Sequence, residues 1–200
     1  MKTTILTIAT VFTVALGLTK TTYAAPVNKS AVTVLTDITA INKIEVRGNV
    51  ELFISDGPAD QVKVYNKYYS ESALVQSKNG VLRIASYASE KLVVWVTAKD
   101  LSSLSAYDNA QVKSFGDISK IEFAVDLHNN ASANLNLNAF NANVTVNDRA
   151  KAELKGSAEE FYLNHNIGST VNNYNFKAAH YTENRTGITI VNKEDDLADL

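Results

Sequence analysis

The chain contains Asp108-Asn109-Ala110-Gln111-Val112 and, 21 residues later, Asn129-Asn130-Ala131-Ser132-Ala133, two phrases in which polar turn residues precede a small residue. The same pattern recurs, with some change of residues, at 148–152, 166–170 and 184–188. Self-similarity at a period of about twenty residues indicates a repeat architecture. The five phrases are 21, 19, 18 and 19 residues apart when measured at their small residues, which are Ala110, Ala131, Ala150, Gly168 and Gly187.

Each phrase follows a short run of alternating apolar residues, such as Phe123 and Val125 or Val144 and Val146. A unit of this length with short strands and tight turns suits a parallel β-helix, because each coil pairs its backbone with the coils above and below. We therefore predict an all-β fold, a right-handed parallel β-helix-like solenoid of about five to seven coils. A β-sandwich is the alternative, because Asn79-Gly80 is typical of a hairpin between antiparallel neighbours.

The part of the chain before Leu101 is also rich in strand patterns. Strands are expected at 44–54, with a bend at Gly48-Asn49, at 61–65, and on both sides of Asn79-Gly80. The nearly continuous apolar run 92–96 is typical of a strand buried on both faces. Its Trp95 is expected to anchor the core, with a sugar-stacking platform as the alternative. The pattern leaves open whether residues 37–98 form coils or a separate hairpin layer.

The N-terminal residues carry an export pattern. Lys2 precedes an uncharged apolar run, and small residues end at Ala24-Ala25, so residues 1–24 are predicted to be a signal peptide. This predicts an extracytoplasmic protein, periplasmic, surface-bound or released, without stable membrane insertion after cleavage. We expect a lead-in at 25–36, a single domain at 37–191, and an acidic tail or cap at 192–200.

Composition narrows the function classes. The chain has no cysteine, so stability must come from packing and hydrogen bonds rather than disulfides. The formal net charge is −2, and lysine and arginine are scattered along the chain. Nucleic-acid binding requires a concentrated basic face, so it is not expected.

Three features together resemble a known family. They are the opening Ile44-Glu45-Val46-Arg47-Gly48-Asn49-Val50-Glu51-Leu52 with Asp56-Gly57, the segment Asn79-Gly80-Val81-Leu82-Arg83-Ile84, and the repeated turn phrases. This pattern is similar to the putative auto-transporter adhesin head GIN domain family of secreted bacterial proteins. The resemblance implies a right-handed β-helix-like fold, an extracytoplasmic location and an adhesin-type role. It carries over no catalytic or binding residue.

Asparagine recurs near every turn, at Asn109, Asn130, Asn147, Asn166 and Asn184. Asparagine tolerates the left-handed backbone conformation and can bond its own backbone, which is the structural explanation. The functional explanation is an amide- and tyrosine-bearing face that binds a surface glycan or an envelope protein. Oxygen atoms of Asp108, Asn129 and Asp148, with those of the neighbouring amides, also suit a calcium ion. The residues predicted for ligand binding are Tyr107, Asn109, Asn130, Asn147, Asn166 and Tyr181.

No familiar catalytic motif occurs in the chain. It has no nucleophile elbow, phosphate-binding loop, dinucleotide fingerprint or metalloprotease helix motif. We therefore expect a protein that is not an enzyme and uses no cofactor. The rival hypothesis is a carbohydrate-active enzyme, a polysaccharide lyase or hydrolase, using two carboxylates. Its candidate carboxylates are Asp108, Asp126, Asp148 and Glu153. A metal site would require the histidines, His128, His165 and His180, to gather with further ligands.

Overall fold

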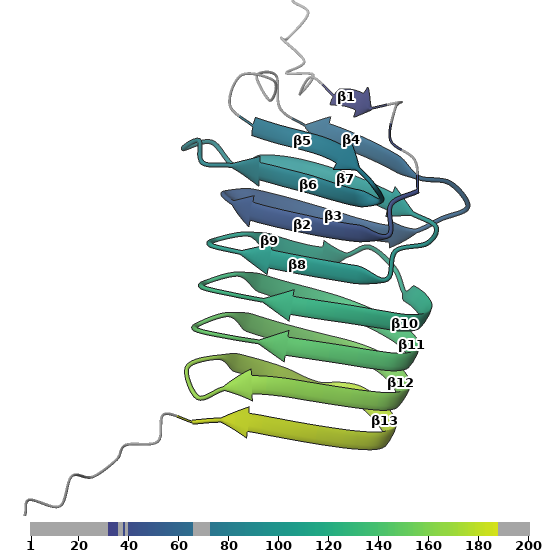
Figure 1. Ribbon diagram of the computed structural model, residues 1–200, viewed down its shortest axis with the longest axis vertical. Helices are drawn as coiled ribbons and strands as arrows, with labels where there is room; N and C mark the ends of the chain where they lie inside the picture. The colour runs from purple at the N-terminus through teal and green to yellow at the C-terminus, as the bar shows by residue number, and fades with distance from the viewer. Residues whose placement is uncertain (1–31, 36–37, 39, 66–72, 188–200) are drawn as a thin grey trace, which may run out of the picture.

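The computed structural model describes residues 32–35, 38, 40–65 and 73–187. Within these ranges the chain is all-β, and its thirteen strands belong to one mixed, strongly curled sheet (Figure 1). The predicted signal peptide and acidic tail lie outside the described residues. Within the described part of the chain, no helix has the length and apolar character needed to cross a membrane. Because all thirteen described strands are hydrogen-bonded into one sheet, they do not form the two sheets of a sandwich.

The C-terminal part of the sheet is a stack of parallel rungs, each rung being one passage of the chain around the stack (Figure 1). Core positions of neighbouring rungs pair in register, as Val125 does with Val144 and Val144 with Leu163. A bulge between Glu153 and Lys155 shifts the register of the last pairing by one residue. The strands of this stack are β8 (Ser103–Tyr107), β9 (Gln111–Ser114), β10 (Ile118–Leu127), β11 (Ser132–Val146), β12 (Lys151–Asn166) and β13 (Thr170–Thr186).

The N-terminal part contributes two more rungs and an antiparallel layer. In one rung β2 pairs parallel with β8 and β3 with β9, and in the other β6 pairs with β2 and β7 with β3. Strand β5 then adds antiparallel to β6, β4 to β7, and β1 to β4. Residues before Leu101 thus form both coils and a hairpin layer. The strands are β1 (Val32–Leu35), β2 (Lys43–Gly48), β3 (Val50–Asp56), β4 (Gln61–Tyr65), β5 (Ala73–Lys78), β6 (Val81–Ser86) and β7 (Leu92–Ala98).

The core is a column of apolar side chains inside the curled sheet. Leu104, Val125, Val144 and Leu163 lie in register on four successive rungs, and each is at most 2% exposed. Side chains alternate between the two faces of a strand, so every second residue enters this column and its neighbours face outward. Burial of each such side chain contributes about 1.5–3 kcal/mol.

The local turn predictions are confirmed at two corners. Asn79 and Gly80 have φ of 51° and 77°, and the two strands they join are antiparallel, as a primed hairpin turn requires. Gly48, with φ of 79°, is the last residue of β2, and only Asn49 lies between it and β3, at the predicted bend. Part of the predicted lead-in is a strand, because Val32–Leu35 forms β1 against β4.

The strand predicted at 92–96 is present in β7, but the prediction that it is buried on both faces is wrong. Leu92, Val94 and Val96 are buried, but Trp95 points to the outer face and is only partly buried. There its ring stacks on Phe53, with centroids 4.6 Å apart, and tilts against Phe115 at 5.4 Å. The run resembles a doubly buried strand because its outer side also carries aromatic and β-branched residues. Among the described strands, none forms a second sheet over that side.

Candidate binding site on the stacked turns

Four tight turns lie above one another along one edge of the stack. In each, the carbonyl of the first residue accepts a hydrogen bond from the N–H of the fourth, over 3.0–3.3 Å. The first residues occupy equivalent positions on successive rungs, so the turns are in register. The four pairs are Tyr107 with Ala110, His128 with Ala131, Asn147 with Ala150, and Asn166 with Ser169.

The left-handed residues of these turns are Asp108, Asn129 and Asp148, with φ of 61°, 60° and 59°. The sequence pattern predicts this conformation for Asn109, Asn130, Asn147, Asn166 and Asn184, and none of them adopts it. In the first three turns the residue next to the predicted asparagine adopts it instead. In these three turns the second residue adopts positive φ and the third does not, as in a type II′ turn. Aspartate and asparagine tolerate positive φ best after glycine. A pattern of adjacent polar residues does not show which of them takes that position.

The small residues after the turns have a packing role. Ala110, Ala131 and Ala150 are fully buried where the chain re-enters the core. In the fourth turn the equivalent residue is Ser169 rather than Gly168, because Thr170 pairs with Lys151. The predicted register is therefore confirmed for three turns and shifted by one residue in the fourth.

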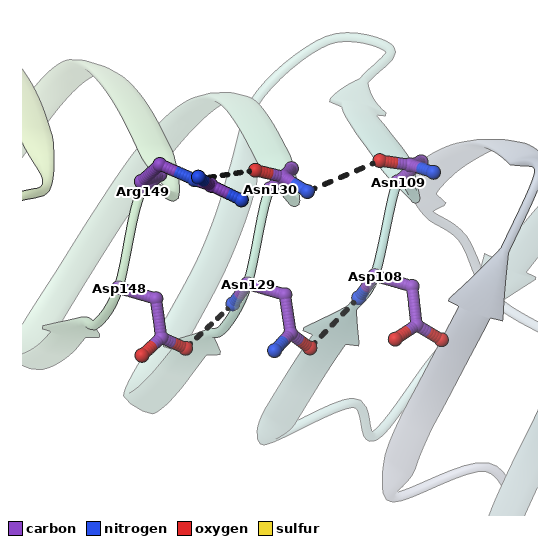
Figure 2. Close-up of a pocket in the computed structure, with 6 residues that line it drawn as sticks. All are labelled: Asp108, Asn109, Asn129, Asn130, Asp148 and Arg149. Carbon is purple, nitrogen blue, oxygen red and sulfur yellow. Dashed lines mark hydrogen bonds between the residues drawn. The ribbon is translucent and has the colours of Figure 1, made fainter.

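Side chains of one turn bond the backbone of the turn before it. Asp148 Oδ2 accepts the N–H of Asn129 at 2.7 Å, and Asn129 Oδ1 accepts the N–H of Asp108 at 3.2 Å (Figure 2). Turn N–H groups that face along the stack thus gain partners on the next rung. We call this row the inner ladder.

A second row of side chains lies beside the inner ladder, and we call it the outer ladder (Figure 2). Arg149 Nε donates to Asn130 Oδ1 at 3.0 Å, and Asn130 Nδ2 donates to Asn109 Oδ1 at 3.4 Å. All three residues are exposed. The row therefore presents planar amide and guanidinium groups to solvent at the spacing of the rungs, about 4.8 Å.

The two ladders line an open hollow of about 660 Å³. Two carboxylates, three amides and one guanidinium surround it, so it offers both donors and acceptors. At one end the hydroxyl of Tyr87 donates to Asp108 Oδ2 at 2.9 Å, and this bond raises the pKa of Tyr87 above its ordinary value. The lining residues are Asp108, Asn109, Asn129, Asn130, Asp148 and Arg149.

The structure brings only two of the predicted binding residues into this hollow, Asn109 and Asn130. Tyr107 is the first residue of its turn, and its ring lies between the Arg47 guanidinium at 3.9 Å and the His128 ring at 5.0 Å. Asn147 and Asn166 occupy the position of Tyr107 two and three rungs further along.

Tyr181 lies apart from the hollow, on β13. It stacks on Phe161, with centroids 5.2 Å apart, and donates to Glu183 Oε2 at 2.6 Å. Burial and the Glu183 carboxylate raise the pKa of Tyr181 to about 12. The predicted face is therefore divided among three places.

One lining residue, Arg149, was not among the candidates. It stands where the two preceding phrases have asparagine, so aligning the phrases singles it out. Its guanidinium supplies the positive charge of the hollow, and it extends the outer ladder by one rung.

The candidate carboxylates and histidines do not gather in one place. Asp108 and Asp148 share the hollow, whereas Asp126 pairs with His128 at 2.9 Å and Glu153 with Lys155 at 2.9 Å. Each remaining histidine also has its own carboxylate, Glu183 for His165 and Glu160 for His180. Among the residues that the structure describes, no three His, Asp or Glu side chains are grouped to hold a metal ion.

Calcium would have to compete for oxygens that already have partners. Asp108 Oδ2 accepts the Tyr87 hydroxyl, Asp148 Oδ2 accepts a backbone N–H, and Asn130 Oδ1 accepts the Arg149 guanidinium. A calcium site needs six to eight oxygens directed at one point. The ladder directs these oxygens at neighbouring turns instead.

The fold and the ladders define a class, all-β proteins built of stacked parallel rungs with amide-rich turns. The chain belongs to the family described as "Putative auto-transporter adhesin, head GIN domain", whose model matches residues 40–189. Membership implies an extracellular or surface location. No curated protein sequence matches the chain.

Solved structures share this fold at low sequence identity. A crystal structure described as a "putative adhesin" from Bacteroides fragilis has a TM-score of 0.69 at 14% identity, covering 78% of this chain and 77% of that one. Another from Parabacteroides merdae has a TM-score of 0.65 at 13% identity, covering 78% of each. A Parabacteroides distasonis structure described as a "putative lipid binding protein" has a TM-score of 0.59 at 11% identity, covering 78% and 79%. At these identities the likeness concerns the fold alone.

Proposed function

We propose that this protein is a secreted, adhesin-like binding protein without enzymatic activity, which attaches to cell-surface material through the hollow on its stacked turns. The observation that carries the proposal is the outer ladder. Asn109, Asn130 and Arg149 are exposed, linked and repeated at the rung spacing. Such a row offers repeated hydrogen-bonding groups to a repetitive ligand, a surface glycan or an envelope protein.

The scaffold supports this role. We infer that the rungs from β8 to β13 act as a right-handed parallel β-helix-like solenoid, in which backbone bonds along the stack hold the turns rigid. Rigid presentation lowers the entropic cost of binding, because the recognising side chains are already placed. The export pattern at residues 1–24 would bring the domain to the compartment where cell-surface material is found.

The absence of enzymatic activity is part of the same proposal. Asp108 and Asp148, the two candidate carboxylates in the hollow, already accept bonds from Tyr87 and from the Asn129 backbone. They are also separated by a whole rung, so about 10 Å lies between their backbones. Among the described residues no long loop encloses the hollow, because each turn that lines it contains only two central residues.

Cell binding tests the proposal. Labelled mature protein is added to bacterial and host cells, and retention is compared with that of the double variant Asn109→Ala, Asn130→Ala. Asn175→Ala, an exposed asparagine on β13, is the matched control. We expect the double variant to lose retention while the control keeps it. Equal retention of all three proteins, or of an unrelated β-helical protein, would overturn the proposal. Product analysis on any bound polysaccharide tests for cleavage.

A further inference from the structure

A second concave surface lies on the outer face of β9, β11, β12 and β13. It is a groove of about 310 Å³ that crosses the strands. Val112, Ala133 and Ala152 are buried toward the core, so their main chain forms the floor. One wall is the row that contains Gln111, Ser132 and Thr170, and the other is the row Lys113, Asn134, Glu153 and Asn172.

The second wall continues into aromatic rings. Lys113 pairs in register with Phe53 on β3, and Phe53 pairs with Trp95 on β7. The Phe53 and Trp95 rings stack 4.6 Å apart, and Phe115, 64% exposed, leans against Trp95. A row of amide and charged groups thus ends on an aromatic platform on the same face of the sheet.

The groove is built for side-chain recognition. Its floor N–H and C=O groups bond neighbouring rungs in the parallel ladder, so a peptide cannot add to it as a strand. Asn134 donates to Glu153 at 2.9 Å, which holds an amide and a carboxylate side by side across two rungs. Planar groups of this kind bind pairs of neighbouring hydroxyls, and aromatic faces stack on the apolar face of a sugar ring.

The spacing also suits a sugar chain. Parallel strands repeat about every 4.8 Å, close to the length that one pyranose unit occupies in an extended polysaccharide. A chain lying along the groove would place one sugar over each strand and bring a sugar ring onto the exposed ring of Phe115, which contacts Trp95. We propose that this groove binds an extended polysaccharide of pyranose units. This inference rests on the proposed surface-binding function and adds to it a second binding surface, on a different face from the turn hollow.

The protein carries its own reporter, because Trp95 is the single tryptophan of the chain. Mature protein is titrated with soluble neutral and uronic-acid-containing polysaccharides while Trp95 fluorescence and heat of binding are followed. We expect at least one polysaccharide to change the fluorescence at the concentrations where heat is released. Phe115→Ala, and separately Asn134→Ala with Asn172→Ala, should weaken binding about tenfold or more. Phe140→Ala, an exposed aromatic outside the groove, should leave it unchanged.

The outcomes separate this inference from the proposed function. If no polysaccharide binds, or if the groove variants bind as well as Phe140→Ala, the groove assignment is overturned even when cells are still retained through the turn hollow. If the groove variants lose polysaccharide binding and Phe140→Ala keeps it, the assignment is supported, whether or not cells are still retained through the turn hollow. Heat without a fluorescence change, unaffected by Phe115→Ala, would place the sugar elsewhere and overturn it.

Discussion

The rungs from β8 to β13 and the region from β1 to β7 build the same column by different routes. In the first, each rung pairs with the rung that follows it directly in the chain. In the second, Lys43 on β2 pairs with Ser103 on β8, although β3 to β7 intervene in the chain, and β2 lies between β6 and β8. Chain order and spatial order agree in one region and differ in the other.

This difference shows what a repeat can and cannot specify. Where rungs that are adjacent in the sequence are also adjacent in space, the repeated phrases predict the pairing even though their residues vary. Where a rung is placed between two later ones, no local pattern contains that information, and closing the longer loop costs more entropy. The antiparallel strands β1, β4 and β5 then end the stack, so parallel rungs do not continue past β6 and β7.

The largest predicted effect concerns two glycines, one in each region, at which the backbone lies very close to a carbonyl group of the adjacent rung. Gly48 and Gly156 have φ of 79° and 110°, and a Cβ on either would lie 2.1 Å from a carbonyl oxygen of the adjacent rung. We expect Gly48→Ala and Gly156→Ala each to lower the free energy of unfolding by about 3 kcal/mol, from left-handed strain plus displacement.

Gly116→Ala is the control for this pair, because Gly116 has the same φ of 79° but nothing within 4 Å of its Cβ position. Strain alone should cost about 1 kcal/mol there. Urea unfolding of the three variants gives the comparison. Equal losses for all three would show that rung contact contributes nothing.

The next effect compares a stacked turn with the hairpin turn. Asn129→Ala and Asn79→Ala both place alanine at positive φ, near 60° and 51°, which should cost about 1 kcal/mol each. Asn129 also accepts the N–H of Asp108, so its replacement should cost about 1 kcal/mol more. Thermal unfolding of both variants and of Asn129→Gly, which avoids the strain but also lacks the accepting side-chain oxygen, measures that bond. Asn129→Gly at wild-type stability would contradict the ladder contribution.

An alkaline effect is expected at the last rung. Folding raises the pKa of Tyr181 to about 12, so between its ordinary value of 10 and 12 the unfolded chain loses this proton first. Stability should therefore fall as pH rises through that window, and below pH 10 Tyr181 should add no pH dependence. Tyr181→Phe should flatten the alkaline limb of a plot of melting temperature against pH. An unchanged limb would argue against the Tyr181–Glu183 bond.

The smallest predicted effect is a loss of stability in acid, and it again allows the two regions to be compared. A hydrogen bond from Lys43, with the charges of Lys43 and Arg83, lowers the pKa of Glu45 on β2. A bond from Tyr181 and another from His165 do the same for Glu183 on β13. Each carboxylate should stabilise the fold above pH 4.5 and lose that contribution as pH falls further.

Glu45→Gln tests this expectation in the first region. For a pair near the surface the loss at neutral pH should be about 0.5 kcal/mol, and it should vanish in strong acid. Melting temperatures at neutral and acid pH, in low and high salt, provide the measurement. A loss that persists in strong acid would point to packing rather than charge.

Much of the local structure was predictable because it depends on near neighbours. The strands at 44–54, 61–65 and 92–96, the hairpin at Asn79-Gly80 and the bend at Gly48 were predicted and are present. At the site, Asn109 and Asn130 were predicted and line the hollow. Arg149 was missed, and the other four predicted residues, Tyr107, Asn147, Asn166 and Tyr181, do not line the hollow.

The sequence by itself determined the all-β class, the length of the rung and the turn residues, because alternation, glycine and asparagine act through the backbone within a few residues. Only the tertiary structure decided that β2 and β3 lie between β6, β7 and β8, β9, and that Trp95 faces outward beside Phe53. It also decided which turn residue takes positive φ. These outcomes depend on contacts between residues far apart in the chain, and alternation along one strand says which side chains share a face but not what that face will meet.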